Sequence, residues 1–323
     1  MPNRLTETLA VRRNRGHMAS QYLINADEQF KNAITAVLHR VPFTDLNQPL
    51  YHFTDVAGPK GILQTRSLWA SLAVALEDPS EIRYALQRAK GIIQRREVGD
   101  DSSLLNEIVP FLDLDNSVIL DTLGMKTYVV SLRTNVDQDA HWKKYGRAGT
   151  GFAIAFALKP LVIPGVLPLP VLYDPVAQDK LLRDFIESNA KLFDELKREC
   201  PHENLWALRQ RAIQFTALGL WTLAPVLKDS LYSQEEEWRL IVVDLEHVQV
   251  QYGKGLSKEV RVRHCSGRDI PYKVLQYDML PIVGLELGPD VAVKESDATL
   301  KQLLREAAGF DVPIVRSQVR VGH

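Results

Sequence analysis

The stretch "LYHFTDVAGPKGILQTRSLWAS", residues 50–71, determines how the rest of the chain is interpreted. Its apolar ends and polar centre predict a short strand over 49–53 and a second one over 67–71. Between them, the sequence predicts a helix over 56–64, with Asp55 as its N-cap. A strand, a short helix and another strand in so few residues favour a fold that mixes α and β structure.

The first of these strands carries polar side chains in an apolar setting. Side chains alternate between the two faces of a strand, so Tyr51 and Phe53 point one way and His52 and Thr54 the other. Two interpretations of the His52 and Thr54 face stay open. It is either a core face on which the histidine bonds to backbone, or one wall of a binding site.

Composition limits the class of protein. The 323 residues include 46% hydrophobic and 24% charged residues, which is typical of a globular protein, and the formal net charge is -1. A net charge this small gives no overall attraction to nucleic acid or to anionic membranes. Two cysteines provide no disulfide framework, and no apolar run approaches the roughly 20 residues of a membrane span. We therefore expect a cytoplasmic chain with no membrane association.

The order of elements favours a mostly antiparallel α+β fold with a helical insertion. Helices are expected over 27–40, 78–98, 102–113 and 296–308, and in two runs within 176–226 that are broken at Pro201, with a short helix or a turn over 138–146. Further strands are expected over 126–133, 151–158, 165–174, 236–245, 258–264, 272–277 and 281–288. Residues 1–24 show no periodicity and are expected to be irregular.

These elements predict three parts of the chain. Residues 1–45 form an N-terminal helical arm, and residues 46–310 form a single catalytic-like α+β domain that contains the insertion 176–226. Residues 311–323 form a tail. The Gly-rich phosphate loops of Rossmann and Walker folds are absent from the sequence.

The strongest candidate for chemistry is "DSLYSQEEEWRLIVV", residues 229–243. On a strand, Glu235, Glu237 and Arg239 share one face. Burying two carboxylates in an apolar sheet costs folding free energy unless each is paired with a positive charge. The spacing places Arg239 where it can supply that counter-charge. The alternative is a solvated strand start with a surface ion pair.

A second candidate is "HWKKYGRAGTGFAIAF", residues 141–156. Trp142 and Tyr145 fall three residues apart and share a helix face, and the glycines that follow let a ligand approach the backbone. The alternative is a pair of core aromatic residues. Ser131, on the strand before this block, is a further candidate. The alternative for Ser131 is a structural role, in which its side chain bonds to a backbone group.

No metal site is predicted. Four residues, Cys200, His202, His264 and Cys265, are of the right type for zinc, but their spacing matches no familiar pattern. No Gly-x-Ser-x-Gly motif is present, so acyl-enzyme chemistry has no support in the sequence.

Taken in order, these motifs resemble a bacterial family known only as domain of unknown function twenty-nine seventy-one. The matching residues are Tyr51, His52, Thr54, Gly61, Ile62, Leu63, Leu68, Trp69, Asp78, Pro79, Glu81, Ser131, Trp142, Tyr145, Gly151, Lys228, Tyr232, Glu235, Glu237, Arg239, Leu285, Leu287 and Gly288. The resemblance covers residues 49–290. Glu77 stands where the family has asparagine.

The opening motif of that family is in turn similar to the start of the ADP-ribosyltransferase fold, a split antiparallel sheet that uses NAD as substrate. The resemblance implies that His52 binds NAD, that Ser131 or Tyr145 is the second element, and that Glu237 is the glutamate of the Glu-x-Glu motif. The Ser-Thr-Ser triplet of that superfamily is absent, and the insertion 176–226 departs from its minimal members.

Roles follow from the chemistry of nicotinamide–ribose cleavage, which has an oxocarbenium-like transition state. Glu237 would stabilise the positive charge on the ribose, Glu235 would position the acceptor, and Tyr145 completes the expected catalytic set. Binding of NAD is expected of the residues His52, Thr54, Ser131, Trp142 and Arg239.

The expected function is therefore that of an NAD-consuming ADP-ribosyltransferase-like enzyme, acting on a macromolecule or on water, as a toxin or an anti-phage effector. One alternative is that the same site binds a nucleotide or nucleic acid but catalyses no reaction, so that the protein acts as a sensor or a partner subunit. Another is a metal-dependent nuclease or phosphotransferase. Expected partners are NAD, a protein or nucleic-acid acceptor, and a partner protein or further copies of the chain.

Overall fold

The chain forms two compact units in the computed structural model, which describes residues 4–41, 47–76, 80–95, 102–113, 125–245, 255–265 and 267–321. The first, here the helical unit, comprises Met1–Val41, Glu81–Leu123 and Asp174–Leu227. The second, here the sheet unit, comprises Pro42–Ser80, Gly124–Tyr173 and Lys228–His323. The predicted insertion thus shares a unit with the start of the chain, while the predicted division into arm, domain and tail stays a prediction.

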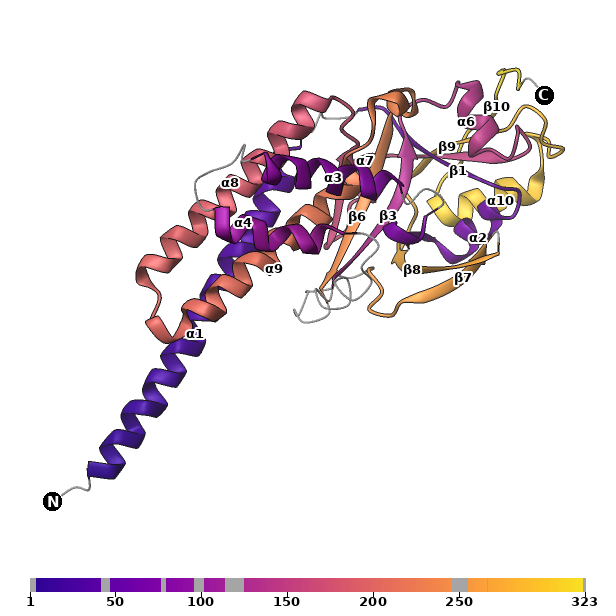
Figure 1. The fold of residues 1–323 in the computed structure, drawn as a ribbon. Helices are drawn as coiled ribbons and strands as arrows, with labels where there is room; N and C mark the ends of the chain where they lie inside the picture. Colours follow the sequence, from indigo (N-terminus) through magenta and orange to yellow (C-terminus); the bar gives the residue numbers. More distant parts are fainter. Residues whose placement is uncertain are drawn as a thin grey trace. The chain divides into compact units, whose positions relative to one another are not determined.

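The helical unit is built from long helices that pack side by side. Its elements are α1 (Arg4–Leu38), α3 (Ser80–Gln94), α4 (Ser102–Ile108), η2 (Val109–Leu112), α8 (Pro175–Glu199), η3 (His202–Asn204), α9 (Leu205–Leu223) and η4 (Ala224–Val226). Figure 1 shows α1, α8 and α9 alongside one another. Phe30 on α1 stacks on Phe215 of α9 with ring centroids 5.7 Å apart.

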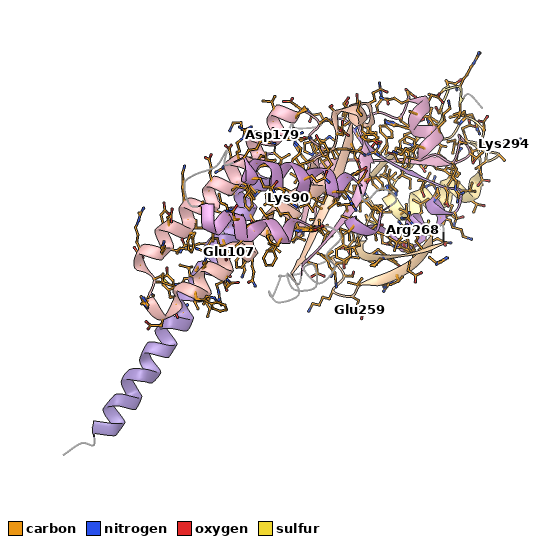
Figure 2. All side chains as sticks on the ribbon, viewed as in Figure 1. Lys90, Glu107, Asp179, Glu259, Arg268 and Lys294 are labelled. Atoms are coloured by element: carbon orange, nitrogen blue, oxygen red, sulfur yellow. The ribbon has the colours of Figure 1, made fainter. Side chains whose placement is uncertain are left out.

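Ion pairs tie the shorter helices to the long ones. Arg88 on α3 donates from Nε to Asp179 of α8 at 3.0 Å, and Arg209 on α9 donates from Nη2 to Glu107 of α4 at 2.8 Å. Figure 2 labels both carboxylates. Each pair joins segments that are distant in sequence, which explains why helices α3 and α4 belong to this unit.

The expectation that residues 1–24 are irregular is wrong, because α1 begins at Arg4. No proline interrupts the segment 4–38, and it holds a single glycine. Alanine, leucine, arginine and glutamine all have a high helix propensity, so a helix can form here although the apolar residues show no helical periodicity. The predicted break at Pro201 is confirmed, since α8 ends at Glu199 and α9 begins at Leu205.

The sheet unit confirms an α+β fold with a mostly antiparallel sheet. Its strands are β1 (Leu50–Thr54), β2 (Ser67–Leu72), β3 (Met125–Arg133), β4 (Phe152–Phe156), β5 (Val166–Pro170), β6 (Glu237–Leu245), β7 (Arg261–Cys265), β8 (Arg268–Gln276), β9 (Ile282–Leu287) and β10 (Ile314–Arg316). Its helical elements are α2 (Gly58–Thr65), η1 (Ala73–Ala75), α6 (Asp139–Lys144), α7 (Leu158–Leu161), η5 (Ser230–Glu235) and α10 (Ala298–Ala308). The strand order is β10-β9-β4-β1-β3-β2-β8-β7, with β6 on β3 and β5 on β6. The β9–β10 pair is parallel and the other pairs are antiparallel.

Strand β3 is the branching point of the sheet. One of its edges pairs with β6 along its whole length. Its other edge pairs with β1 at Arg133 and with β2 at Val129 and Tyr128. In the register of the described strands, residues 130–132 have no strand partner on that second edge. The sheet therefore divides between β1 and β2.

Side-chain alternation on β1 is confirmed. Leu50 belongs to the main apolar core, together with Ile154 and Trp238. Tyr51 and Phe53 pack on the other face in a smaller cluster around Trp142.

Two local details differ from the sequence prediction. Helix α2 has Ala57 as its N-cap residue, and Asp55 accepts hydrogen bonds from the backbone N–H groups of Ala57 and Gly58 at 3.1 and 2.9 Å. The predicted edge strand is shorter than expected and pairs only with β6 in the described sheet, as its prolines require. Among the described residues, no helix combines the length and apolar character needed to cross a membrane.

The glycine loop before β4 predicts a test of the packing in this unit. A Cβ atom on Gly151 would lie 2.4 Å from the Thr54 carbonyl oxygen, which is backbone and cannot step aside. We expect Gly151→Ala to lower the free energy of unfolding by about 1–3 kcal/mol, measured by urea denaturation. The control is Gly61→Ala on α2, where a Cβ meets nothing within 4 Å, so a neutral or stabilising effect is expected. Equal effects of the two substitutions would contradict this account.

Candidate functional site

The register of β3 and β6 brings charged residues face to face. Arg133 lies opposite Glu237, and Ser131 lies opposite Arg239. Opposed residues of an antiparallel pair have Cβ atoms about 5 Å apart, so their side chains interact directly. Arg133 Nη1 accordingly lies 3.2 Å from Glu237 Oε1.

Glu237 is paired on both of its oxygens. Arg239, two residues along the same strand, donates from Nε to Oε1 at 2.8 Å and from Nη2 to Oε2 at 2.9 Å. Lys228 adds a contact to Oε2 at 3.3 Å. Only 1% of the Glu237 side chain is exposed. The prediction that Arg239 supplies the counter-charge is confirmed.

Glu235 precedes the strand and reaches the same cations. It ends η5, and the next residue, Glu236, has a left-handed backbone with φ of 44° that turns the chain into β6. Lys228 donates to Glu235 Oε2 at 2.6 Å, and Lys144 donates to Oε1 at 2.9 Å. Arg133 lies 3.3 Å from Oε2. Lys228 thus bridges the two carboxylates.

We refer to these six side chains as the carboxylate–cation cluster: Arg133, Lys144, Lys228, Glu235, Glu237 and Arg239. Four cations face two carboxylates, which leaves an excess of two positive charges. Lys144 is the most exposed member, with 54% of its side chain open to solvent. The cluster is therefore buried at Glu237 and open at Lys144.

Electrostatics keep both carboxylates ionised. Burial alone would raise the pKa of Glu237, but Arg239, Arg133 and Lys228 outweigh it and hold that pKa well below the ordinary 4.5. The pKa of Glu235 is lowered in the same way, with burial opposed by Lys228, Arg133 and Lys144. At neutral pH the site therefore presents two fixed negative charges within a positive surround.

Tyrosine rings line the cluster. The Arg133 guanidinium lies 4.5 Å from the ring centroid of Tyr145, and Lys228 Nζ lies 5.2 Å from that of Tyr232. Tyr173 Oη accepts a hydrogen bond from the Glu237 backbone N–H at 3.1 Å, and burial raises the Tyr173 pKa to about 12. Tyr145, predicted from the sequence, therefore does lie at this site.

His52 lies at the branching point of the sheet. Its Nδ1 is 3.1 Å from the Ser131 carbonyl oxygen, in the stretch of β3 that has no strand partner on that edge. Burial lowers the pKa of His52, so the ring is neutral at pH 7. A ring nitrogen beside a carbonyl oxygen must donate, so Nδ1 carries the proton.

The face that His52 takes differs from that of the cluster. Tyr51 lies opposite Arg133, and Arg133 lies opposite Glu237, so these three share one face of the sheet. His52 alternates to the other face and meets β3 at its edge. His52 and Glu237 therefore both lie next to strand β3, but their side chains are on opposite faces of the sheet.

No side chain of the remaining predicted residues pairs with a carboxylate of the cluster in the described contacts, although Ser131 lies opposite Arg239 in the strand register. Trp142 is fully buried and packs edge-to-face on Phe53 with centroids 5.0 Å apart. Thr54 lies opposite Phe152 on β4. Ser131 meets His52 through its main-chain carbonyl. Glu77, Asp78 and Pro79 of the family motif lie outside the described residues.

Five residues of the site were not predicted as site residues from the sequence: Arg133, Lys144, Tyr173, Lys228 and Tyr232. Lys228 and Tyr232 precede Glu235 in the family motif, so their spacing was an available signal. Arg133 enters only through the β3–β6 register, which no local pattern encodes.

A cavity of about 360 Å³ lies elsewhere in the sheet unit. Its lining comes from the loop after β9 and from the C-terminal segment, and it includes Asp290, Arg316 and Arg320. No predicted site residue lines it. Within the described ranges, no group of three or more histidine, cysteine, aspartate or glutamate side chains could hold a metal ion.

The depressed pKa of Glu237 makes stability depend on pH. A carboxylate with a lowered folded pKa stabilises the protein in full above its unfolded pKa, near 4.5, and this contribution is lost as pH falls through the folded value. We expect Glu237→Gln to cost about 3–5 kcal/mol at pH 7, because three cations lose a buried partner. The loss should stay constant from pH 7 down to the ordinary value of 4.5 and shrink only as pH falls below it toward the folded pKa, as measured by urea unfolding at several pH values.

A matched control exists on β9. Burial and the charge of Asp137 raise the pKa of Glu286, so its ionisation opposes folding at neutral pH. Glu286→Gln should therefore change the pH dependence with the opposite sign. If both variants gave parallel pH profiles, the assignment of Glu237 as a paired, ionised carboxylate would be wrong.

Comparison with protein families places part of this site in a known group. The model described as "Protein of unknown function (DUF2971)" matches residues 141–240, which run from His141 on α6 to Leu240 on β6. Neither the curated proteins nor the solved structures yield a match. The matched segment holds five of the six members of the carboxylate–cation cluster, all except Arg133. Over residues 141–240, about a third of the chain, the sequence is thus similar to the DUF2971 family of proteins of unknown function.

Proposed function

We propose that the sheet unit binds NAD at the carboxylate–cation cluster and cleaves the nicotinamide–ribose bond, passing ADP-ribose to a macromolecule or to water. One observation supports this above all. Ser131 and Glu237 are more than a hundred residues apart in sequence, yet they share one face of the paired strands β3 and β6, and Tyr145 contacts Arg133 of the same cluster. The division of the sheet beside β3 is compatible with the split sheet of ADP-ribosyltransferases.

The reaction needs an ionised carboxylate beside the ribose. The bond between ribose C1′ and the nicotinamide nitrogen breaks, and nicotinamide leaves as a neutral base with the electron pair. The positive charge left on the ribose is stabilised by a carboxylate, for which Glu235 and Glu237 are the candidates. An acceptor oxygen then bonds to C1′ and releases its proton to a carboxylate or to solvent.

The cation excess matches the other half of the substrate. The diphosphate of NAD carries two negative charges, the same number as the unbalanced positive charges of the cluster. Phosphate oxygens compete with carboxylates for Lys144, Lys228 and Arg133, because both are anionic acceptors. Binding would thereby release Glu235 first, since it is the outer carboxylate, with 11% of its side chain exposed.

A second candidate function is nucleotide binding without turnover. The burial of Glu237 favours this function. Both of its oxygens take part in ion pairs and its side chain is almost fully buried, so neither oxygen is open to a substrate. In that case the carboxylates hold the cations in place for a phosphorylated ligand, and the protein acts as a sensor or a partner subunit.

The test measures nicotinamide release from NAD by the purified chain, with and without lysate or nucleic acid as a source of acceptor. We expect Glu235→Gln and Glu237→Gln to lose roughly 10²- to 10⁴-fold in rate, the range for acid–base groups. The control is Glu195→Gln on α8, an exposed carboxylate in the helical unit, which should keep the full rate. An added chelator should leave the rate unchanged.

The other outcomes separate the two functions. Equal NAD binding by the wild type and Glu237→Gln, with turnover by neither, favours the sensor. Absence of both binding and release under every condition contradicts both. Circular dichroism of each variant distinguishes lost chemistry from lost folding, and Glu235→Gln, at the less buried position, is the variant more tolerant of substitution.

A further inference from the structure

A stacked aromatic pair lies on the other side of the division in the sheet. Trp69 on β2 stacks on Tyr272 of β8, with centroids 4.4 Å apart and planes 22° apart. The register explains the contact, because Ser71 is opposite Tyr272 and Trp69 is two residues before it. Tyr272 is buried, whereas 43% of Trp69 is exposed. The Trp69 ring therefore packs on the buried Tyr272 ring and is itself open to solvent.

Arginines share this face of the sheet. On the edge strand β7, Arg261 lies opposite Tyr272, and Cys265 lies opposite Arg268. Alternation adds Arg263 to the same face, while His264 and Asp269 pair with each other at 3.0 Å on the opposite face. On β7 and β8 the face of Tyr272 thus holds three arginines and no carboxylate. Figure 2 labels Arg268 at this end of the sheet unit.

One arginine is held in place beside the aromatic pair. Arg263 donates from Nη2 to Ser71 Oγ at 3.0 Å, so its guanidinium crosses β8 toward β2. Its Nε is buried and has no hydrogen-bond partner among the described residues. The guanidinium is thus held at Ser71, two residues from Trp69 on the same face, where an anionic ligand with an aromatic group would meet both a cation and a ring.

Protection of the sheet edge explains only part of this pattern. Charged side chains on an edge strand prevent pairing with other chains, and β7 is such a strand. That reason applies to Arg261 and Arg263, but it does not account for an exposed tryptophan on β2, two strands inward on the same face.

We propose that this surface, the Trp69 platform (Ser71, Trp69, Arg261, Arg263, Arg268 and Tyr272), binds single-stranded nucleic acid. A base stacks on the open face of Trp69, and the arginines take the phosphates. A single strand fits because its bases are free to stack, whereas duplex bases are not. Three arginines spread over two strands match a chain of phosphates better than one nucleotide. The inference goes beyond the proposed NAD chemistry and does not depend on it.

The test is fluorescence anisotropy of a labelled single-stranded oligonucleotide, titrated with the full chain in the absence of NAD. We expect Trp69→Ala to weaken binding by about 5- to 140-fold, the range for the loss of one stacked base. Trp69→Phe should retain most of the affinity. The matched control is Trp206→Ala, which removes another exposed tryptophan, 74% open to solvent, from the helical unit and should change nothing.

A second variant keeps the inference testable if Trp69→Ala fails to fold. Arg263→Gln should weaken binding and reduce the slope of log affinity against log salt by about one. Equal binding by Trp69→Ala and Trp206→Ala, or competition by a mononucleotide as strong as that by the strand, would overturn the proposal. Because NAD is absent, failure of nicotinamide release leaves this result unaffected.

Discussion

Glu237 is an ionised carboxylate in the interior of a sheet, and its pairing with Arg133 and Arg239 joins β3 to β6 at the point where the sheet divides. Burying a charge costs several kcal/mol unless hydrogen bonds and counter-charges replace its water. Here a guanidinium from the same strand takes both oxygens, and a second arrives across the register. Removing Glu237 would leave three buried cations without that partner, so this carboxylate holds the cluster together.

That unit connects the sheet to the proposed functions. In the proposed function its excess of positive charge would attract phosphate, while its two carboxylates stay negative at neutral pH because the same cations hold their pKa values down. Beside the division of the sheet, β2, β7 and β8 present Trp69 and three arginines, which suit bases and phosphates. A nucleotide site and a strand-binding surface in one unit would bring an acceptor and a donor of ADP-ribose to the same sheet.

Local patterns in the sequence predict most of the elements, because alternation and proline act within a few residues. They also predict the pairing of Glu237 with Arg239, since two positions on one strand share a face. The partnership with Arg133 depends on the register between strands more than a hundred residues apart, and no local pattern contains it. The face of His52 was predicted correctly relative to Tyr51, but its relation to Glu237 needed the same long-range register. The helix at the start of the chain was missed because it has propensity without periodicity.

The central claim is that a phosphorylated nucleotide takes cations away from the two carboxylates. The most direct measurement is carboxyl-carbon NMR of labelled Glu235 and Glu237 across a pH titration, with and without saturating ADP-ribose. Without the ligand, both carboxylates should titrate below the ordinary value of 4.5. With the ligand, both pKa values should rise, because phosphates occupy Lys144, Lys228 and Arg133. Identical titration curves in the two conditions would contradict the account.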